Sequence, residues 1–262
     1  MINCKNLVAD LEKLFSSLKI SNPTSINEKS ENDFVTNLDI ELQGSISRVL
    51  RSYKNVPVLG EESPKSEFVI SEEYWVVDPL DGTSNFIMGI PLIASSIAFV
   101  SDGIVRFGLV YDFSAKKSYW AELGGGSYVG TELIKRNINA GRPKLIGCST
   151  GFLKALDRLP AANPKASVFD QVNFRVLGSQ ALQLCYVALG KLDANFSVEA
   201  KIWDDLAASL ILTEAGCHYR AIALENDRIT SCFAKDIKMR SVAVAHEYQF
   251  EVGFKLMKEL CV

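Results

Sequence analysis

The segment Asp78–Phe86, with the sequence DPLDGTSNF, carries two carboxylates three residues apart. The apolar run Tyr74–Val77 predicts a buried strand that delivers Asp78 at its end, and the glycine and threonine that follow Asp81 are typical of a helix start. Carboxylates hold hard cations, and backbone N–H groups at a helix N-terminus favour anions. The segment therefore indicates a joint site for a divalent cation and a phosphate group. A plain strand–turn–helix, in which both aspartates only cap, remains the alternative.

Acidic residues also stand at the ends of three other expected elements. Glu61 follows an apolar, strand-like run, and Asp204 and Asp205 open an otherwise apolar helix. Asp39 has capping-box spacing from Thr36. Taken singly, these residues could be a solvated loop glutamate and ordinary helix caps. Taken together, they supply the oxygen ligands that two or three Mg²⁺ ions require.

Other phosphate and metal chemistries fit the sequence less well. Haloacid dehalogenase phosphatases separate their two catalytic aspartates by one residue, whereas two residues separate Asp78 from Asp81. The sequence contains no Walker phosphate-binding loop. Its two histidines, His218 and His246, are too few for a histidine-rich zinc hydrolase, and we expect both at the surface or at helix ends.

Two helices and an antiparallel sheet are expected to position these acids in the first half of the chain. Helical periodicity covers residues 3–20, and a second helix starts near Thr36. The polar segment Glu28–Asp33 lies between them. The predicted strands are Tyr74–Val77, Leu92–Val100, Ile104–Tyr111 and Lys117–Leu123. Pro79 is expected to end the first of these strands.

The second half alternates strands with helices, which favours an α/β layer. The predicted strands are Lys144–Cys148, Phe174–Leu177 and Leu192–Val198. The predicted helices are Gly151–Leu159, Ser179–Leu189 and Trp203–Ala215, the last with a single core face that includes Leu206 and Ile211. This change in element order predicts two halves, residues 1–138 and 139–262.

Composition narrows the class of protein. The 262 residues are 48% apolar and 23% charged with a net charge of −3, which indicates a globular chain and disfavours duplex nucleic acid as a partner. No apolar run is long enough to span a membrane, and the N-terminus does not read as a signal peptide. The six cysteines form no C-x-x-C pair, which favours reduced core thiols. We expect a cytoplasmic protein.

The sequence resembles the inositol monophosphatase family of magnesium-dependent, lithium-sensitive phosphatases. Four segments occur in the order typical of that family, so the resemblance spans most of the chain. They are Lys29–Asp39, Gly60–Ser63, Asp78–Phe86 and Trp203–Gly216. The resemblance implies a layered αβαβα sandwich, commonly dimeric, that hydrolyses a small phosphate monoester with two or three Mg²⁺ ions. It also implies that Mn²⁺ can replace Mg²⁺ and that Ca²⁺ and Li⁺ inhibit.

The resemblance also implies roles for individual residues. It makes Glu61, Asp78, Asp81, Asp204 and the Leu80 carbonyl metal ligands, with Glu61 also near a third, weaker ion. The Thr83–Asp39 dyad would orient and deprotonate the attacking water. Lys29 and Asp33 would belong to a mobile segment near the metals. The implied substrate contacts are Gly82, Thr83, Asp81, Gly178, Ser179, Gln180 and Glu199.

The substrate stays open at this point. Inositol-type members of the family carry a substrate-contacting glutamate where this chain has Ser197, and the nearest acid is Glu199. Inositol 1-phosphate is the leading expectation, and the alternatives are 3′(2′),5′-bisphosphate nucleotides, histidinol phosphate and fructose 1,6-bisphosphate. Some bacterial proteins that resemble this chain also bind transcription or RNA-processing machinery, so an additional non-catalytic role is an alternative of another class.

Overall fold

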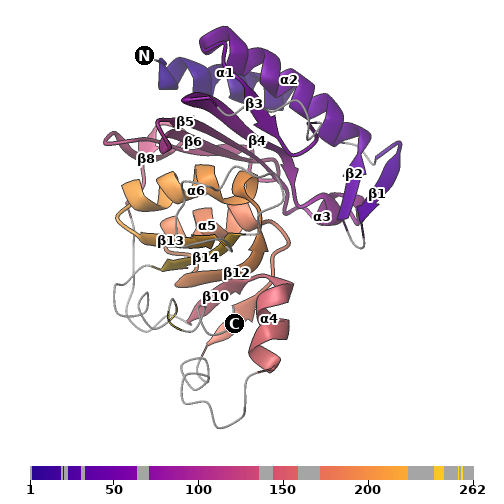
Figure 1. The fold of residues 1–262 in the computed structure, drawn as a ribbon, viewed down its shortest axis with the longest axis vertical. Helices are drawn as coiled ribbons and strands as arrows, with labels where there is room; N and C mark the ends of the chain where they lie inside the picture. Colours follow the sequence, from indigo (N-terminus) through magenta and orange to yellow (C-terminus); the bar gives the residue numbers. More distant parts are fainter. Residues whose placement is uncertain are drawn as a thin grey trace.

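The structure, a computed structural model, describes residues 2–18, 20, 23–30, 33–63, 71–135, 144–158, 172–223, 239–244, 253 and 255. In this part of the chain, layers of helix, sheet, helix, sheet and helix follow one another (Figure 1). The predicted layered αβαβα sandwich is confirmed. The predicted boundary at residues 138 and 139 lies outside the described residues.

The two N-terminal helices form the outer layer over the first sheet (Figure 1). Helix α1 (Cys4–Ser17) starts at Asn3, whose side chain accepts the Asn6 N–H. Helix α2 (Asn37–Tyr53) starts at Thr36 with the expected capping box to Asp39. Each helix buries one apolar stripe against the sheet, as its period predicts. The fully buried members of the two stripes are Leu7, Leu11, Leu42, Ile46 and Leu50.

A two-stranded hairpin fills the polar segment between these helices. Strands β1 (Ile26–Ser30) and β2 (Asp33–Thr36) pair antiparallel. No strand was predicted here, because every residue of β1 is exposed and no alternation of apolar and polar residues is needed.

The first sheet has seven strands in the order β3-β4-β5-β6-β7-β8-β9. They are β3 (Val58–Gly60), β4 (Glu73–Asp81), β5 (Ala94–Ser101), β6 (Ile104–Asp112), β7 (Lys117–Glu122), β8 (Gly126–Val129) and β9 (Glu132–Leu133). The expectation of an antiparallel sheet is wrong at one edge, where β3 runs parallel to β4. A three-residue strand shows no pattern from which its direction could be predicted.

Pro79 does not end β4, contrary to expectation. The ladder with β5 shifts register between Asp78 and Asp81 and resumes where Asp81 faces Ala94. Proline lacks an N–H donor, and an irregularity in the ladder is one of the places where a sheet accepts it. The shift keeps both aspartates on the strand, at its C-terminal end.

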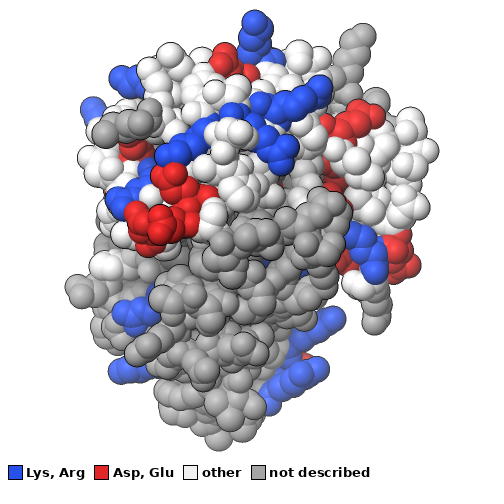
Figure 2. All heavy atoms as spheres, turned by 45° about the horizontal axis from the view of Figure 1, so that its top comes forward, with Lys and Arg blue, Asp and Glu red and all other residues white. Residues whose placement is uncertain are grey.

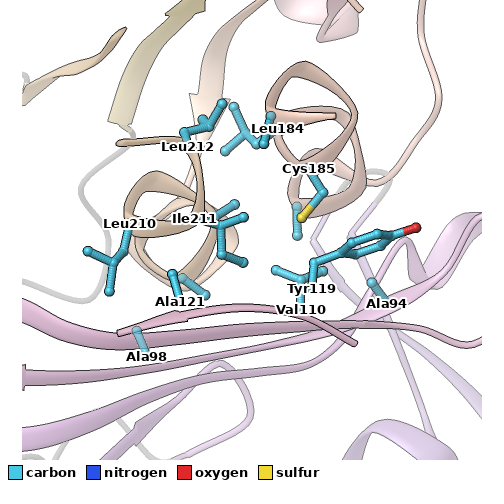
Figure 3. Close-up of a cluster of buried hydrophobic side chains, with 14 of the residues drawn as sticks. Ala94, Ala98, Val110, Tyr119, Ala121, Leu184, Cys185, Leu210, Ile211 and Leu212 are labelled. Atoms are coloured by element: carbon cyan, nitrogen blue, oxygen red, sulfur yellow. The ribbon is translucent and has the colours of Figure 1, made fainter. Parts of the chain in front are cut away.

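Helices α5 (Gln180–Ala188) and α6 (Ile202–Glu214) form the middle layer, between the two sheets (Figure 1). Their apolar side chains pack on small residues of the first sheet, such as Ala94, Ala98 and Ala121 (Figure 3). The single core face predicted for α6 is wrong, because residues from Ala207 to Leu212 are all buried. Between two sheets, this part of the helix has no solvent face to keep polar.

The second sheet has the strand order β11-β10-β12-β14-β13. Its strands are β10 (Leu145–Cys148), β11 (Asn173–Arg175), β12 (Ala194–Ala200), β13 (His218–Ala223) and β14 (Met239–Val244). The first three were predicted, whereas β13 and β14 were not. Helix α4 (Thr150–Asp157) packs on β12 in the last layer.

The structure tests some of the predictions about cysteines, histidines and membrane spans. Cys4, Cys148, Cys185 and Cys217 are buried, as expected for core thiols, and His218 is exposed. Cys232, Cys261 and His246 lie outside the described residues. No helix in the described ranges is long and apolar enough to cross a membrane. On the face in Figure 2, a band of Lys and Arg side chains lies directly beside a group of acidic ones.

Candidate active site

The two aspartates of β4 end up in different surroundings. Asp78 is buried, and its Oδ1 accepts the Leu80 N–H at 2.9 Å. Asp81 reaches the start of α5, where its Oδ2 accepts the Ser179 hydroxyl at 2.6 Å and the Ala181 N–H at 2.7 Å. Asp81 therefore ties the first sheet to a helix that is 100 residues further along the chain.

Helix α3 (Thr83–Ile87) starts directly after Asp81 and lies beside β2 (Figure 1). Gly82 opens it with a φ of +94°, and a Cβ here would lie 2.8 Å from the Leu92 carbonyl oxygen. Glycine is therefore required by both conformation and space. The predicted strand–turn–helix is confirmed.

The Thr83 hydroxyl lies 3.1 Å from Asp39 Oδ1 and 3.0 Å from the Leu80 carbonyl oxygen. The other oxygen of Asp39 accepts the Thr36 N–H at 2.8 Å and the Thr36 hydroxyl. Asp39 thus caps α2 with one oxygen and contacts Thr83 with the other. This geometry is compatible both with Asp39 as a helix cap and with Asp39 as the partner of Thr83 in the dyad.

The hairpin β1–β2 reaches the acids that follow β3. Lys29 Nζ lies 2.9 Å from both Glu61 Oε1 and Glu62 Oε1 and 3.4 Å from Asp33 Oδ1. Burial disfavours the ammonium, but the charges of Glu61 and Glu62 dominate and raise the pKa of Lys29. Lys29 is therefore a permanent cation against these carboxylates at neutral pH.

Asp204 comes from the first turn of α6. Its Oδ2 accepts the Lys201 N–H at 2.6 Å, so it caps this helix. The Lys201 ammonium lies 3.4 Å from Asp33 Oδ2. Asp33 therefore contacts Lys29 with one oxygen and Lys201 with the other, which links the hairpin to the N-terminus of α6.

The charges of these acids act on one another. Burial raises the pKa of Asp78 well above its usual range, and the charges of Glu61, Asp81 and Asp204 raise it further. Burial, then Asp81 and Glu61, raise the pKa of Asp204 in the same way. Burial raises the pKa of Asp81 to about 6, although its hydrogen bonds from α5 oppose the shift. Buried carboxylates that repel one another favour a cation among them.

A cleft of about 190 Å³ opens beside Asp81 and Asp204. Gly178, Ser179, Gln180 and Glu199 line it, so all four of these sequence-predicted residues meet there. Glu199 Oε1 also accepts the Gly151 N–H at 2.9 Å, at the start of α4. Ser197 lines the same cleft and is buried.

Two residues that support the site were not predicted. Gln43 accepts the Glu62 N–H at 3.0 Å, and its amide donates to Ser63, so α2 fixes the turn after β3. Asn85 Nδ2 lies 2.8 Å from the carbonyl oxygens of both Leu92 and Leu177 and so joins α3 to the segment before α5. Both contacts join residues far apart in sequence, and no local pattern could have indicated them.

Comparison with known proteins gives a consistent result. A sequence model of the inositol monophosphatase family matches residues 2–258. The Nus factor SuhB of Pasteurella multocida is 38% identical over 194 residues, which are 72% of this chain and 72% of that protein. The inositol-1-monophosphatase of Mesorhizobium japonicum is 34% identical over 197 residues, 73% of each chain.

The solved structures agree with the sequence relatives. Thermotoga maritima IMPase matches with a TM-score of 0.75 at 25% identity, and the match covers 98% of this chain and 95% of that one. The chain therefore belongs to the inositol monophosphatase family of Mg²⁺-dependent enzymes and is a phosphoric monoester hydrolase.

Proposed function

We propose that this protein hydrolyses a small polyol or sugar phosphate with a water molecule activated by paired Mg²⁺ ions. The observation that carries the proposal is that the charges of Glu61, Asp78, Asp81 and Asp204 act on one another, with Asp78 and Asp81 directly before the α3 N-terminus. The half formed by residues 1–138 supplies most of the metal ligands in this account. The half formed by residues 139–262 adds Asp204 and the substrate loop.

The donor set suits a hard cation. Carboxylate and carbonyl oxygens are the ligands that Mg²⁺ prefers, and Mg²⁺ keeps several waters or substrate oxygens. We assign Glu61, Asp78 and the Leu80 carbonyl to one ion and Asp78, Asp81 and Asp204 to another, with Glu61 near a third. Among the described residues, no three His, Cys, Asp or Glu side chains lie close enough together to hold a metal ion by themselves. The proposed sites therefore depend on water and phosphate oxygens to complete the shell of each ion.

The chain's own groups then have distinct tasks. When bound, paired Mg²⁺ ions activate water and neutralise charge on the leaving oxygen of an in-line displacement. The Thr83 hydroxyl orients the attacking water, and the Asp39 carboxylate, 3.1 Å from it, takes up the proton that Thr83 relays. The N–H groups of Gly82 and Thr83 hold the phosphate oxygens. No side chain needs to form a covalent phosphoenzyme.

The cleft beside Asp204 is the place for the rest of the substrate. Ser179, Gln180 and Ser197 offer neutral hydrogen-bonding groups there, and Glu199 offers a carboxylate already engaged by Gly151 N–H. Neutral donors and acceptors suit the hydroxyls of a polyol or sugar. Inositol 1-phosphate is the substrate we favour, with histidinol phosphate, fructose 1,6-bisphosphate and 3′(2′),5′-bisphosphate nucleotides as alternatives.

A panel of phosphate esters tests this proposal. Release of phosphate would be measured from inositol 1-phosphate, 3′-phosphoadenosine 5′-phosphate, fructose 1,6-bisphosphate and histidinol phosphate, with Mg²⁺, with Mn²⁺ and with added Ca²⁺ or Li⁺. We expect turnover that requires Mg²⁺, accepts Mn²⁺ and is inhibited by Ca²⁺ and Li⁺, with inositol 1-phosphate the best substrate. Absence of phosphate release from every ester at saturating Mg²⁺ would contradict the proposal.

The proposal also covers the cellular location and the oligomeric state of the enzyme. We infer a cytoplasmic homodimer that has no duplex nucleic acid as partner. Cys4, Cys148 and Cys185 are buried and form no disulfide, which suits a reducing compartment. Light scattering of the purified protein tests the dimer, and a monomeric mass at micromolar concentration would exclude it.

We also infer a second, non-catalytic role in transcription. The observation that favours it is that relatives 38% and 36% identical to this chain are named Nus factor SuhB. A strain that lacks the gene would be complemented with wild type and with Asp78→Asn. Rescue by the inactive variant supports a role separate from catalysis. Failure of that variant, with normal expression and rescue by wild type, argues that catalysis is the whole function.

A further inference from the structure

Asp205 follows the proposed metal ligand Asp204 on α6 but turns to different partners. It is fully buried, with no exposed surface. Its Oδ1 accepts the Gln180 Nε2–H at 2.9 Å, and its Oδ2 accepts the Tyr219 hydroxyl at 2.7 Å. Asp205 thus connects α6 to the first residue of α5 and to β13, whereas Asp204 caps its own helix.

Gln180 is the residue that connects Asp205 to the proposed metal site. Its Oε1 accepts from Asn195 Nδ2 at 3.2 Å and from Gln183 Nε2 at 3.4 Å, so both ends of its amide are held. Its backbone N–H donates to Asp81 Oδ1 at 3.3 Å. The amide orientation is thereby fixed, because the oxygen faces two donors and the nitrogen faces the Asp205 carboxylate.

Three consecutive residues at the start of α5 donate hydrogen bonds to the Asp81 carboxylate. Ser179 and Ala181 donate to one oxygen of Asp81 and Gln180 to the other. Gln180 is the central residue of the three. A displacement of Gln180 would therefore move the donors that orient the Asp81 carboxylate.

We propose that Asp205 is a positioning residue that holds Gln180, and through it the α5 turn that orients Asp81, so that it sets the affinity of the site for Mg²⁺. This inference rests on the proposed role of Asp81 as a metal ligand. Groups that orient metal ligands change metal affinity by about 10- to 100-fold in other proteins. A change transmitted through one intermediate residue is expected at the lower end of that range.

The surroundings of Asp205 make a purely structural role a poor explanation. Residues Ala207 to Leu212 of α6 are buried between two sheets. An apolar side chain in such a layer stabilises a fold at least as well as a buried carboxylate does, because removing the charge from water is costly. The effect that distinguishes the carboxylate is that it holds two donors, the Gln180 amide and the Tyr219 hydroxyl, in place.

The test compares two substitutions at one position in the full-length protein. Asp205→Leu removes both hydrogen bonds. Asp205→Asn keeps an oxygen for Gln180 Nε2 and can donate to the Tyr219 hydroxyl, so it preserves the contacts and removes the charge. Mg²⁺ dissociation constants are measured by titration calorimetry, and kcat is measured at saturating Mg²⁺ with the best ester of the panel. Asp193→Asn is the matched control, because Asp193 accepts the Leu145 N–H at the other end of β12.

We expect Asp205→Leu to raise the Mg²⁺ dissociation constant about tenfold, with kcat at saturating Mg²⁺ within about threefold of wild type. Asp205→Asn and Asp193→Asn should stay within about twofold in both quantities, since each keeps the contacts of Gln180. A dissociation constant unchanged by Asp205→Leu would overturn the inference. So would equal weakening by Asp205→Asn, which would assign the effect to charge and not to position.

Two further outcomes are decisive. If Asp205→Leu does not fold, Tyr219→Phe takes its place, because it removes one donor to Asp205. We expect Tyr219→Phe to weaken Mg²⁺ affinity two- to fourfold. An unchanged affinity in this variant would overturn the inference. If wild type itself binds no Mg²⁺, the proposed function fails, and this inference fails with it. Mg²⁺ binding by wild type with unaltered Asp205 variants overturns the inference alone.

Discussion

Asp78 has the least favourable surroundings of the acids in the site. It is buried, and three other carboxylates raise its pKa. Its own hydrogen bond from the Leu80 N–H is too weak a compensation for a buried charge. A bound cation would offset this cost, and in the proposed arrangement both ions share Asp78.

Replacement of Asp78 by asparagine separates activity from stability. We expect Asp78→Asn to lower kcat at least ~1000-fold, about 4 kcal/mol in the barrier, because the shared ligand is lost. In EDTA the same variant should melt at a higher temperature than wild type, because one repelling charge is gone. Phosphate release and thermal denaturation measure the two effects. Activity within about tenfold of wild type at saturating Mg²⁺ would exclude Asp78 as the shared ligand.

Asp39 combines a structural and a proposed catalytic contact, and two variants distinguish them. Asp39→Asn should lower kcat about 100- to 10,000-fold, since the proposed proton acceptor of the Thr83 dyad is lost. Thr36→Val, the control, removes the hydroxyl from the same capping box and leaves the Thr83 contact. We expect it to cost about 1 kcal/mol of unfolding free energy with kcat nearly unchanged. Equal loss of kcat in both variants would reduce Asp39 to a helix cap.

The sequence predicted the acids of the site but not the residues that orient them. Asp78 and Asp81 stand next to a proline, a glycine and a strand end, so local chemistry marks them. Gln43 and Asn85 act through contacts that span 19 and 92 residues, and each looks like an ordinary polar residue in its own segment. Asp205 was predicted with Asp204 as a metal ligand or a helix cap, whereas its partners in the structure lie on α5 and β13.

At the scale of elements, the close approach of α6 to β6 holds the middle layer on the first sheet. A Cβ at Gly108 would lie 2.4 Å from the Ala207 carbonyl oxygen. Backbone atoms cannot give way as a flexible side chain can, so only glycine fits here.

Gly108→Ala should therefore destabilise the fold by about 1–3 kcal/mol through overpacking. Gly44→Ala is the control, since nothing lies within 4 Å of a Cβ at this position in α2. Alanine favours a helix over glycine, so we expect Gly44→Ala to stabilise by about 0.5–1 kcal/mol. Urea denaturation measures both variants. A neutral Gly108→Ala would show that α6 and β6 can separate without cost.

Elements with strong periodicity were predicted well, and weak ones were missed for physical reasons. Helices α1 and α2 each bury one stripe, so a period near 3.6 marks them. Strand β1 is exposed along its whole length and β3 has three residues, so neither carries a pattern. The burial of α6 on several sides follows from its place between two sheets, which no single segment encodes.

For the whole molecule, the site joins the first sheet to the middle helices and should couple metal binding to stability. Asp81 receives hydrogen bonds from α5, and the Ser96 hydroxyl of β5 donates to the Trp203 carbonyl of α6. The carboxylates that repel one another come from both halves of the chain. A cation between them would offset the repulsion in the folded state only.

Removal of Mg²⁺ should therefore lower the melting temperature. At a Mg²⁺ concentration 100 times the dissociation constant, linkage predicts about 2.7 kcal/mol of added stability. For a chain of this size, that corresponds to about 5–10 °C. Thermal denaturation in EDTA and in Mg²⁺ measures the shift for wild type, with Asp78→Asn as the control that should lose most of it. An equal shift in both proteins would place the stabilising ion elsewhere.

We propose that Glu61, Asp78, Asp81 and Asp204 jointly hold a pair of divalent ions. Anomalous diffraction from crystals soaked in Mn²⁺ tests it most directly, because Mn²⁺ takes the same oxygen ligands as Mg²⁺ and its position can be seen. We expect two adjacent anomalous peaks, about 3.5–4 Å apart, both within bonding distance of Asp78. Well-diffracting soaked crystals with Mn²⁺ bound elsewhere, and none among these four carboxylates, would contradict it.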